Sequence, residues 1–253
     1  QYPIPADMPT IADVFNEKNL AELNGHLGIG HVRYSTTGES YLANAQPLVV
    51  NYKNKGIALA HNGNLVNADG IREMFEDEGV IFQTTVDTEV IANLLARYYK
   101  TGIENALRKV VGILKGAYAL VVLTEGKLIG IRDPHGLRPL CIGKYNGSYV
   151  IASESCALDT IGADLVRDVE PGEMIIIDDD GFRSVKSDKW CRKNACIFEL
   201  IYFSRPDSIV DGISANSYRF KTGRILAEES HVEADRVIPV PDSGIPAAIG
   251  YSE

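Results

Sequence analysis

The chain has 253 residues, 45% of them hydrophobic, so it can bury the core of one large domain or of one domain and part of another. Its 25 Lys and Arg residues against 34 Asp and Glu give a formal charge of -9. Because like charges repel, this balance argues against nucleic acid and anionic membranes as partners. No apolar run reaches the roughly 18 residues of a membrane span, and we expect a cytoplasmic protein with reduced cysteines.

The first elements in chain order are two predicted strands, separated by a loop. The first covers residues 28–38, and its last four residues form the loop. The second strand, at 56–60, is small and apolar. It is expected to stop where four polar residues suited to a turn follow: His61, Asn62, Gly63 and Asn64.

Three helices are predicted next, over residues 68–79, 84–100 and 102–116. The first ends at Gly79, a residue type common after a helix terminus. The middle helix begins with the cap-type residues Thr85 and Asp87. Its apolar residues fall on one stripe, which predicts packing on another element: Val90, Ile91, Leu94, Leu95 and Tyr98.

From residue 117 the pattern becomes that of β-hairpins, with turns at 124–126, 144–147 and 179–181. Antiparallel strands with helices gathered before them predict an α+β class in which helices cover stacked sheets. We place a domain boundary near residue 190, between a domain at 1–190 and a segment at 191–253. In that segment we expect a helix at 216–234 and a strand at 235–243.

Four polar clusters lie at the ends of apolar runs, at 33–38, 61–64, 84–89 and 133–138. Each alone is most simply a turn or a helix cap. Together they suggest a receptor for an amino acid. Arg33 offers a fork for a carboxylate, Asp87 an anion for an ammonium group, and Asn62 with Gly63 the donors that stabilise an oxyanion.

A nucleophile for acyl transfer is the missing part of this receptor. Attack on an amide needs an activated Cys, Ser or Thr. Ser35, Thr36 and Cys141 are present, but none lies beside a histidine in a recognisable motif.

Eight segments, in order along nearly the whole chain, resemble motifs of the glutamine phosphoribosylpyrophosphate amidotransferase family, a branch of the class II glutamine amidotransferases. They are GHVRYSTTG at 30–38, LAHNGNLVN at 59–67, VDTEV at 86–90, KGAYAL at 115–120, RDPHGLRPL at 132–140, VIASESCALD at 150–159, EPGEMIIID at 170–178 and IYFSRPDS at 201–208.

The resemblance implies an N-terminal nucleophile fold, a four-layer αββα sandwich of antiparallel sheets, followed by the start of an α/β phosphoribosyltransferase domain. It implies that glutamine is hydrolysed and its ammonia passed to 5-phosphoribosyl 1-diphosphate (PRPP), giving phosphoribosylamine in the first step of purine synthesis. By matching motifs, Arg33 binds the glutamine α-carboxylate and Thr36 lines the same pocket. Asn62 and Gly63 form the oxyanion hole, and Asp87 binds the α-amino group.

Departures from the family pattern concern both ends of the chain. The family's nucleophile is the amino-terminal cysteine of the mature protein, whereas this chain starts with Gln1. We therefore expect a fragment that lacks about 50 family residues at its start, estimated from where the first motif falls in such a domain. The PRPP-binding signature is also not found. We expect the fragment to be inactive and assign the function to the parent enzyme.

Cofactors and partners are implied by the resemblance alone. Cys196 matches the first cysteine ligand of a 4Fe–4S iron–sulfur cluster found in some members, although a cysteine there can also be an ordinary small apolar residue. Mg²⁺ would accompany PRPP in the transferase domain. Purine nucleotides are implied as feedback inhibitors, and the assembly as a homo-oligomer.

Two alternatives stay open at this point. One is another class II amidotransferase, such as the hexosamine-forming or asparagine-forming enzymes, against which the SRPDS run at 204–208 argues. The other is a noncatalytic glutamine-binding module that has no nucleophile.

Overall fold

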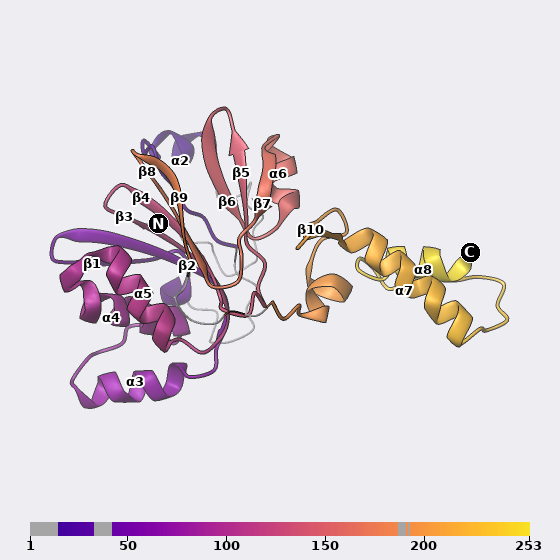
Figure 1. Ribbon diagram of the computed structural model, residues 1–253, viewed down its shortest axis with the longest axis horizontal. Coiled ribbons are helices and arrows are strands. Elements are labelled where there is room, and N and C mark those ends of the chain that lie inside the picture. Colours follow the sequence, from indigo (N-terminus) through magenta and orange to yellow (C-terminus); the bar gives the residue numbers. More distant parts are fainter. Residues whose placement is uncertain (1–14, 33–41, 187–190, 192) are drawn as a thin grey trace. The chain divides into compact units, whose positions relative to one another are not determined.

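The computed structural model describes residues 15–32, 42–186, 191 and 193–253 (Figure 1). The chain divides into two compact units, the first within 1–130 and 175–185, the second within 131–174 and 186–253. The boundary near residue 190 stays a prediction, because a compact unit and a family domain are different things.

The first unit holds the larger sheet and most of the helices. Its elements are α2 (Glu17–Ala21), η1 (Leu42–Asn44), β1 (Leu48–Tyr52), β2 (Lys55–Leu65), α3 (Ala68–Asp77), α4 (Asp87–Tyr98), η2 (Tyr99–Thr101), α5 (Ile103–Ile113), β3 (Gly116–Thr124), β4 (Lys127–Arg132), β8 (Glu173–Asp178) and β9 (Gly181–Lys186). One or two end residues of β4, β8 and β9, Arg132 among them, are assigned to the second unit.

The larger sheet has the strand order β1-β2-β3-β4-β8-β9, and β2 is antiparallel to both β1 and β3. Helix α4 packs on β1 and β2, and both α3 and α5 pack on α4, as Figure 1 shows. The predicted stripe explains this arrangement, because Val90, Ile91, Leu94 and Leu95 are all at most 1% exposed. Burying four such side chains contributes on the order of 1.5 to 3 kcal/mol each.

Strand β2 differs from the sequence prediction. It runs through Leu65, so the turn expected at His61–Asn64 is wrong. A polar run stays in a strand when a neighbour takes its backbone hydrogen bonds, and β3 pairs with β2 along this stretch, from Ile57↔Thr124 to Leu65↔Gly116. Gly63 has φ +141°, and a Cβ there would lie 2.0 Å from the carbonyl oxygen of Ala117, so only glycine fits.

The second unit holds the smaller sheet and the last helices. Its elements are β5 (Cys141–Tyr145), β6 (Ser148–Ala152), α6 (Ser155–Ile161), β7 (Asp164–Asp168), the π-helical turn η3 (Glu199–Phe203), β10 (Ile209–Val210), β11 (Ile213–Ser214), α7 (Ala215–Glu229) and α8 (Ile245–Ser252).

The smaller sheet has the order β6-β5-β7, with both pairings antiparallel. Its hairpin turn at Asn146-Gly147 has positive φ at both residues, as the sequence predicted. Helix α6, which the sequence did not predict, buries Leu158 against Cys141 and Ala163.

The strand predicted at 235–243 does not form, and of the strand predicted at 28–38 only residues 28–32 lie among the described residues. Residues 28–32, the described part of the first predicted strand, are irregular, and so are residues 235–240. An extended segment needs a neighbouring strand to take its hydrogen bonds, and none of the described strands pairs with either segment. The chain instead continues into α8, which packs on α7 so closely that a Cβ at Gly223 would lie 1.9 Å from the carbonyl oxygen of Ala247.

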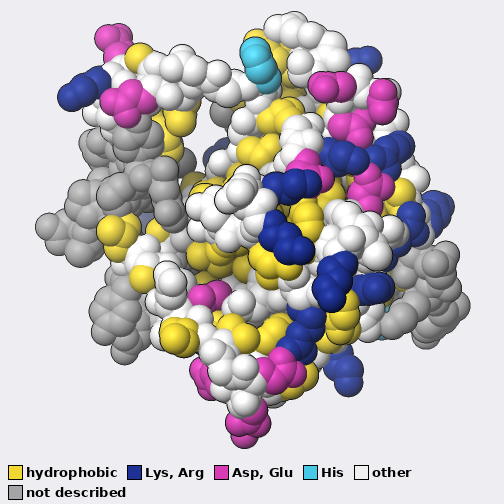
Figure 2. Space-filling view, turned by 90° about the vertical axis from the view of Figure 1, so that its left-hand side faces the viewer, with side chains coloured by type: hydrophobic (Ala, Val, Ile, Leu, Met, Phe, Trp, Pro, Cys, Tyr) yellow, Lys and Arg dark blue, Asp and Glu magenta, His cyan; other side chains and the backbone are white. Residues whose placement is uncertain are grey.

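The predicted α+β class is confirmed by these helices and antiparallel strands. In the described part of the chain, no helix combines the length and the apolar character needed to cross a membrane. Figure 2 shows one face of the molecule, on which basic, acidic and hydrophobic side chains are intermixed.

Candidate active site

The second half of β2 brings the predicted site residues to α4. Successive side chains of a strand point to opposite faces, so His61 shares a face with Leu59, which the helices cover. Both are buried, at 3% and 1% exposure. Asn62 lies on the other face and is half-buried. The strand therefore separates the histidine from the asparagine that follows it.

Asp87 is the first residue of α4 and joins that helix to the end of β2. Its Oδ1 lies 3.2 Å from His61 Nδ1, and its Oδ2 accepts the backbone N–H of Leu65 at 3.0 Å. The two contacts fall on either side of Asn62 and Gly63. Hydrogen bonds to Asp87 thus fix the position of the strand segment that carries the predicted oxyanion donors.

The pKa of Asp87 lies below its ordinary value. Burial pulls this pKa upward, but the hydrogen bond and charge of His61 outweigh it, together with the N–H groups of Leu65 and Thr88. The start of a helix also favours a negative charge. Asp87 is therefore a carboxylate at neutral pH, as a receptor for an ammonium group requires.

The backbone of β2 favours Gly63 as an oxyanion donor. In a strand, every second N–H points to the same edge. The N–H of His61 donates to Gln46 Oε1 at 2.7 Å, and that of Leu65 donates to Asp87. Gly63 lies between them, so its N–H is directed to the same edge, where β1 no longer pairs with β2 beyond Leu59.

A second carboxylate organises the loop before α4. Glu89 is 8% exposed and accepts the N–H of Gln83 at 2.9 Å, the N–H of Thr84 at 2.7 Å and the hydroxyl of Thr84 at 2.7 Å. Thr85 pairs with the buried Asn44 through two hydrogen bonds, of 2.8 and 3.1 Å. The predicted side-chain cap by Thr85 is not made, because Val86 occupies the cap position.

The remaining predicted residues divide into two groups. Arg33, Ser35 and Thr36 lie outside the described residues. Cys141 is 2% exposed, and burial raises the pKa of its thiol to about 12. A thiol that stays protonated at neutral pH is a poor nucleophile, so Cys141 is not the attacking group.

The polar cluster at 133–138 belongs to the second unit and is a structural anchor. The Asp133 carboxylate accepts the N–H groups of His135, Leu137 and Arg138 at 2.9 to 3.1 Å. Arg132 beside it is 1% exposed and forms a two-pronged ion pair with Asp211, at 2.9 and 3.0 Å. These contacts hold the loop to the 209–214 hairpin, so a turn explains this motif.

A metal site is not formed by the described residues, among which no three His, Cys, Asp or Glu side chains gather. Cys196 is partly exposed and supplies one candidate ligand. The iron–sulfur cluster stays a prediction.

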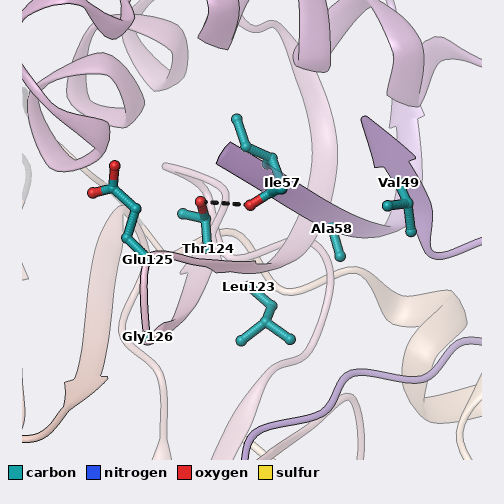
Figure 3. Close-up of a pocket in the computed structure, with 8 residues that line it drawn as sticks. Val49, Ile57, Ala58, Leu123, Thr124, Glu125 and Gly126 are labelled. Carbon is teal, nitrogen blue, oxygen red and sulfur yellow. Dashed lines mark hydrogen bonds between the residues drawn. The ribbon is translucent and has the colours of Figure 1, made fainter. Parts of the chain in front are cut away.

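An open pocket of about 300 Å³ lies at the start of β2, away from Asp87 (Figure 3). The Thr124 hydroxyl donates to the carbonyl of Gly56 in its wall, at 2.9 Å. Glu125 is its one charged lining residue, and Figure 3 shows apolar side chains around the rest. A glutamine site needs partners for a carboxylate and an ammonium group, which these residues do not provide together.

Comparison with known proteins identifies the family of this chain. The family model described as a glutamine amidotransferase domain matches residues 31–160, about half of the chain. The chain belongs to the glutamine amidotransferase family. Residues 61–64 and 84–89 both lie inside the matched range, and so does Arg33.

Two curated relatives are identical to this chain at about half of the aligned positions. Amidophosphoribosyltransferase of Archaeoglobus fulgidus is 51% identical over 97% of this chain and 54% of its own length. The Bacillus subtilis enzyme of the same name is 49% identical over 96% of this chain and 51% of its own length. The chain thus spans about half the length of the curated relatives it matches.

Solved structures similar to this chain come from the same family. The glutamine phosphoribosylpyrophosphate amidotransferase of B. subtilis, complexed with ADP and GMP, is 49% identical, with a TM-score of 0.82 over 88% of this chain and 48% of that one. A structure described as the allosteric regulatory enzyme of purine biosynthesis gives a TM-score of 0.84 at the same identity. The resemblance seen in the motifs is confirmed.

Sequence reasoning gave no role to four residues of this site: Asn44, Gln46, His61 and Glu89. A signal for His61 was present, since the alternation of β2 continues from Ile57 and Leu59 to His61. The link from Asn44 to Thr85 has no local signal, because it joins residues 41 apart.

Proposed function

We propose that this chain is the glutamine-using part of an amidophosphoribosyltransferase. This glycosyltransferase takes ammonia from glutamine and transfers it to PRPP, forming 5-phosphoribosylamine in the first step of purine synthesis. Identity near 50% to relatives of that name, over almost the whole chain, supports the assignment. The single observation that carries it is the Asp87 carboxylate, anchored to both His61 and Leu65 around Asn62 and Gly63.

The proposed roles follow from the chemistry of glutamine. Its α-ammonium group binds Asp87, and its α-carboxylate binds Arg33, with Thr36 beside it. Attack on the side-chain amide produces a tetrahedral oxyanion, to which Asn62 and the N–H of Gly63 donate. Removing one such donor costs roughly 100- to 1000-fold in rate in comparable acyl-transfer sites.

The attacking group in this proposal is the amino-terminal cysteine of the family, ahead of the first motif. Its thiolate adds to the amide carbon, ammonia leaves, and water then releases glutamate from the thioester. Cys141 and Cys156 do not replace it, because both are buried.

Further partners are part of the same proposal. We place the protein in the cytoplasm, with purine nucleotides as feedback inhibitors and a homo-oligomeric assembly. The B. subtilis relative was solved with ADP and GMP, which supports nucleotide regulation. Mg²⁺ accompanies PRPP, and Cys196 is a candidate iron–sulfur ligand.

The test uses the full-length protein expressed from its gene. We expect glutamate release from glutamine and PRPP-dependent formation of phosphoribosylamine. Glutamate release with no product from PRPP would indicate another class II amidotransferase. Glutamine binding without any hydrolysis would indicate a noncatalytic module.

Asp87→Asn tests the proposed ammonium site. A charge-assisted hydrogen bond contributes about 1.5 to 3 kcal/mol, so KM for glutamine should rise by about 10- to 100-fold. Asp69→Asn is the matched control, because Asp69 is an exposed acid in the first turn of the neighbouring helix α3. An unchanged KM in Asp87→Asn contradicts the assigned role.

A further inference from the structure

His61 lies behind Asp87 as seen from solvent. The side chain of His61 is 1% exposed, whereas that of Asp87 is 21% exposed. A ligand that reaches the Asp87 carboxylate from solvent therefore meets Asp87 first. Any contribution of His61 to ligand binding acts through the carboxylate in front of it.

The hydrogen bond between the two residues fixes the histidine proton. A carboxylate only accepts hydrogen bonds, so the ring nitrogen that faces it must carry the proton. That nitrogen is Nδ1, 3.2 Å from Asp87 Oδ1, with the Thr88 hydroxyl a more distant neighbour at 3.4 Å. Nε2 is buried and has no hydrogen-bond partner among the described residues. Burying a polar ring with an unpaired nitrogen costs free energy, which the contact with Asp87 offsets.

The carboxylate needs this second anchor. The terminal torsion of an aspartate is broad, so a carboxylate held at one oxygen can rotate. The N–H of Leu65 holds Oδ2, and His61 Nδ1 holds Oδ1. A carboxylate accepts about four hydrogen bonds. With His61, Leu65 and the N–H of Thr88 as donors, a position remains for a donor that arrives from solvent.

We propose that His61 is a positioning residue for substrate recognition: through Nδ1–H it holds the Asp87 carboxylate in the orientation that receives the α-ammonium group of glutamine. This inference rests on the proposed function, because it takes glutamine as the ligand of Asp87. It assigns the histidine that precedes Asn62 and Gly63 to substrate binding, with no proton transfer to or from the substrate.

The test compares two substrates in the full-length protein. Glutaramate is glutamine without its α-amino group, so it cannot use Asp87. His61→Leu should lower kcat/KM for glutamine by about 10-fold or more through KM, since a hydrogen bond to a charged group is lost. The same variant should keep kcat/KM for glutaramate within about twofold of the unsubstituted protein's value. Glutaramate has no ammonium group, so a defect confined to the ammonium site does not affect its binding.

Two further variants separate positioning from packing. Asparagine places its amide N–H near the position of Nδ1, so His61→Asn should restore most of the preference for glutamine over glutaramate. Thr84→Val is the matched control, because it disturbs the start of α4 through Glu89 without contacting Asp87. Thr84→Val should change both substrates by the same factor.

A measurement on the unsubstituted protein covers the case in which His61→Leu does not fold. The ¹⁵N shifts of the His61 ring should show a proton on Nδ1. A proton on Nε2 with a bare Nδ1 overturns the proposal, and so does an equal loss for both substrates in His61→Leu. If the full-length protein releases no glutamate at all, the proposed function fails, while the tautomer still reports whether His61 donates to Asp87.

Discussion

Two polar clusters look alike in the sequence and differ in the structure. The cluster around Arg132 in the second unit is almost completely buried, and its charges are paired with each other and with carbonyl groups. The guanidinium donates to Asp211 and to the carbonyls of Arg138, Val169 and Gly136, at 2.8 to 3.0 Å. The cluster around His61 in the first unit leaves Asp87 partly open to solvent and the Nε2 of His61 without a described partner.

This difference distinguishes a polar cluster that only stabilises the fold from one that can bind a ligand. A buried polar group must be hydrogen-bonded, and a fully satisfied network has nothing left to offer a ligand. Burial tends to lower the pKa of Arg132, but Asp211 outweighs it and raises that pKa. The cation is therefore locked within the fold, whereas Asp87 keeps one acceptor position for a donor from outside.

Arg132→Met should give the largest loss of stability, because it leaves three buried carbonyls without their donor and Asp211 with Lys193 alone. Removing one partner of a buried ion pair costs about 3 to 5 kcal/mol. Urea unfolding of the chain, followed by circular dichroism, measures the change. Arg205→Met is the matched control. Its ion pair with Asp207 is exposed, at 68% and 53% for the two side chains, so its loss should change the free energy of unfolding little. Equal losses for the two variants would contradict the comparison.

Gly63→Ala should give the next largest effect and should act on the site as well as on stability. Its positive φ alone costs an alanine about 1 to 3 kcal/mol, and the contact with Ala117 adds to this. Gly70→Ala is the matched control, because Gly70 lies in α3 with no atom within 4 Å of an added Cβ. That variant should be stabilised by up to about 1 kcal/mol. Glutamate release should fall in Gly63→Ala and stay unchanged in Gly70→Ala.

Arg183→Met should give the smallest effect, and its effect should depend on pH. Hydrogen bonding to Arg183 lowers the pKa of Glu104 to about 2, with burial opposing and Lys127 assisting. A carboxyl group whose pKa is lowered in the folded state stabilises the fold at pH values above its ordinary pKa of 4.5. This stabilisation is lost as the pH falls towards 2. The variant should therefore be less stable by under about 1 kcal/mol at pH 7, since the pair is partly exposed. The difference should shrink at pH 3; a difference that grows on acidification contradicts the pairing.

Much of the fold followed from local patterns. Three features depend on nearby residues: the stripe on α4, the turn at Asn146-Gly147 and the end of α3 shortly before Gly79. The extent of β2 did not, because whether His61 to Asn64 turn or continue is decided by β3, which lies more than 50 residues further along the chain. The strand expected at 235–243 failed for the converse reason, since no described strand offers it a partner.

The candidate site shows the same division. Residue types at Arg33, Asn62, Gly63 and Asp87 were enough to suggest an amino-acid receptor. In the structure, Asp87 contacts His61 and Leu65, the residues on either side of Asn62 to Asn64. The role of His61 depends on a 3.2 Å contact between two elements. The strand period could place His61 on the helix-covered face, but only packing could place it against Asp87.

The hydrogen bond from Leu65 to Asp87 makes one backbone amide a reporter of the site. The N–H of Leu65 is held by a side chain and not by a neighbouring strand, so its hydrogen exchange needs only that contact to open. Its exchange rate therefore measures how firmly the carboxylate is held. A ligand that orders Asp87 slows the exchange of this amide, and the change can be followed without any turnover.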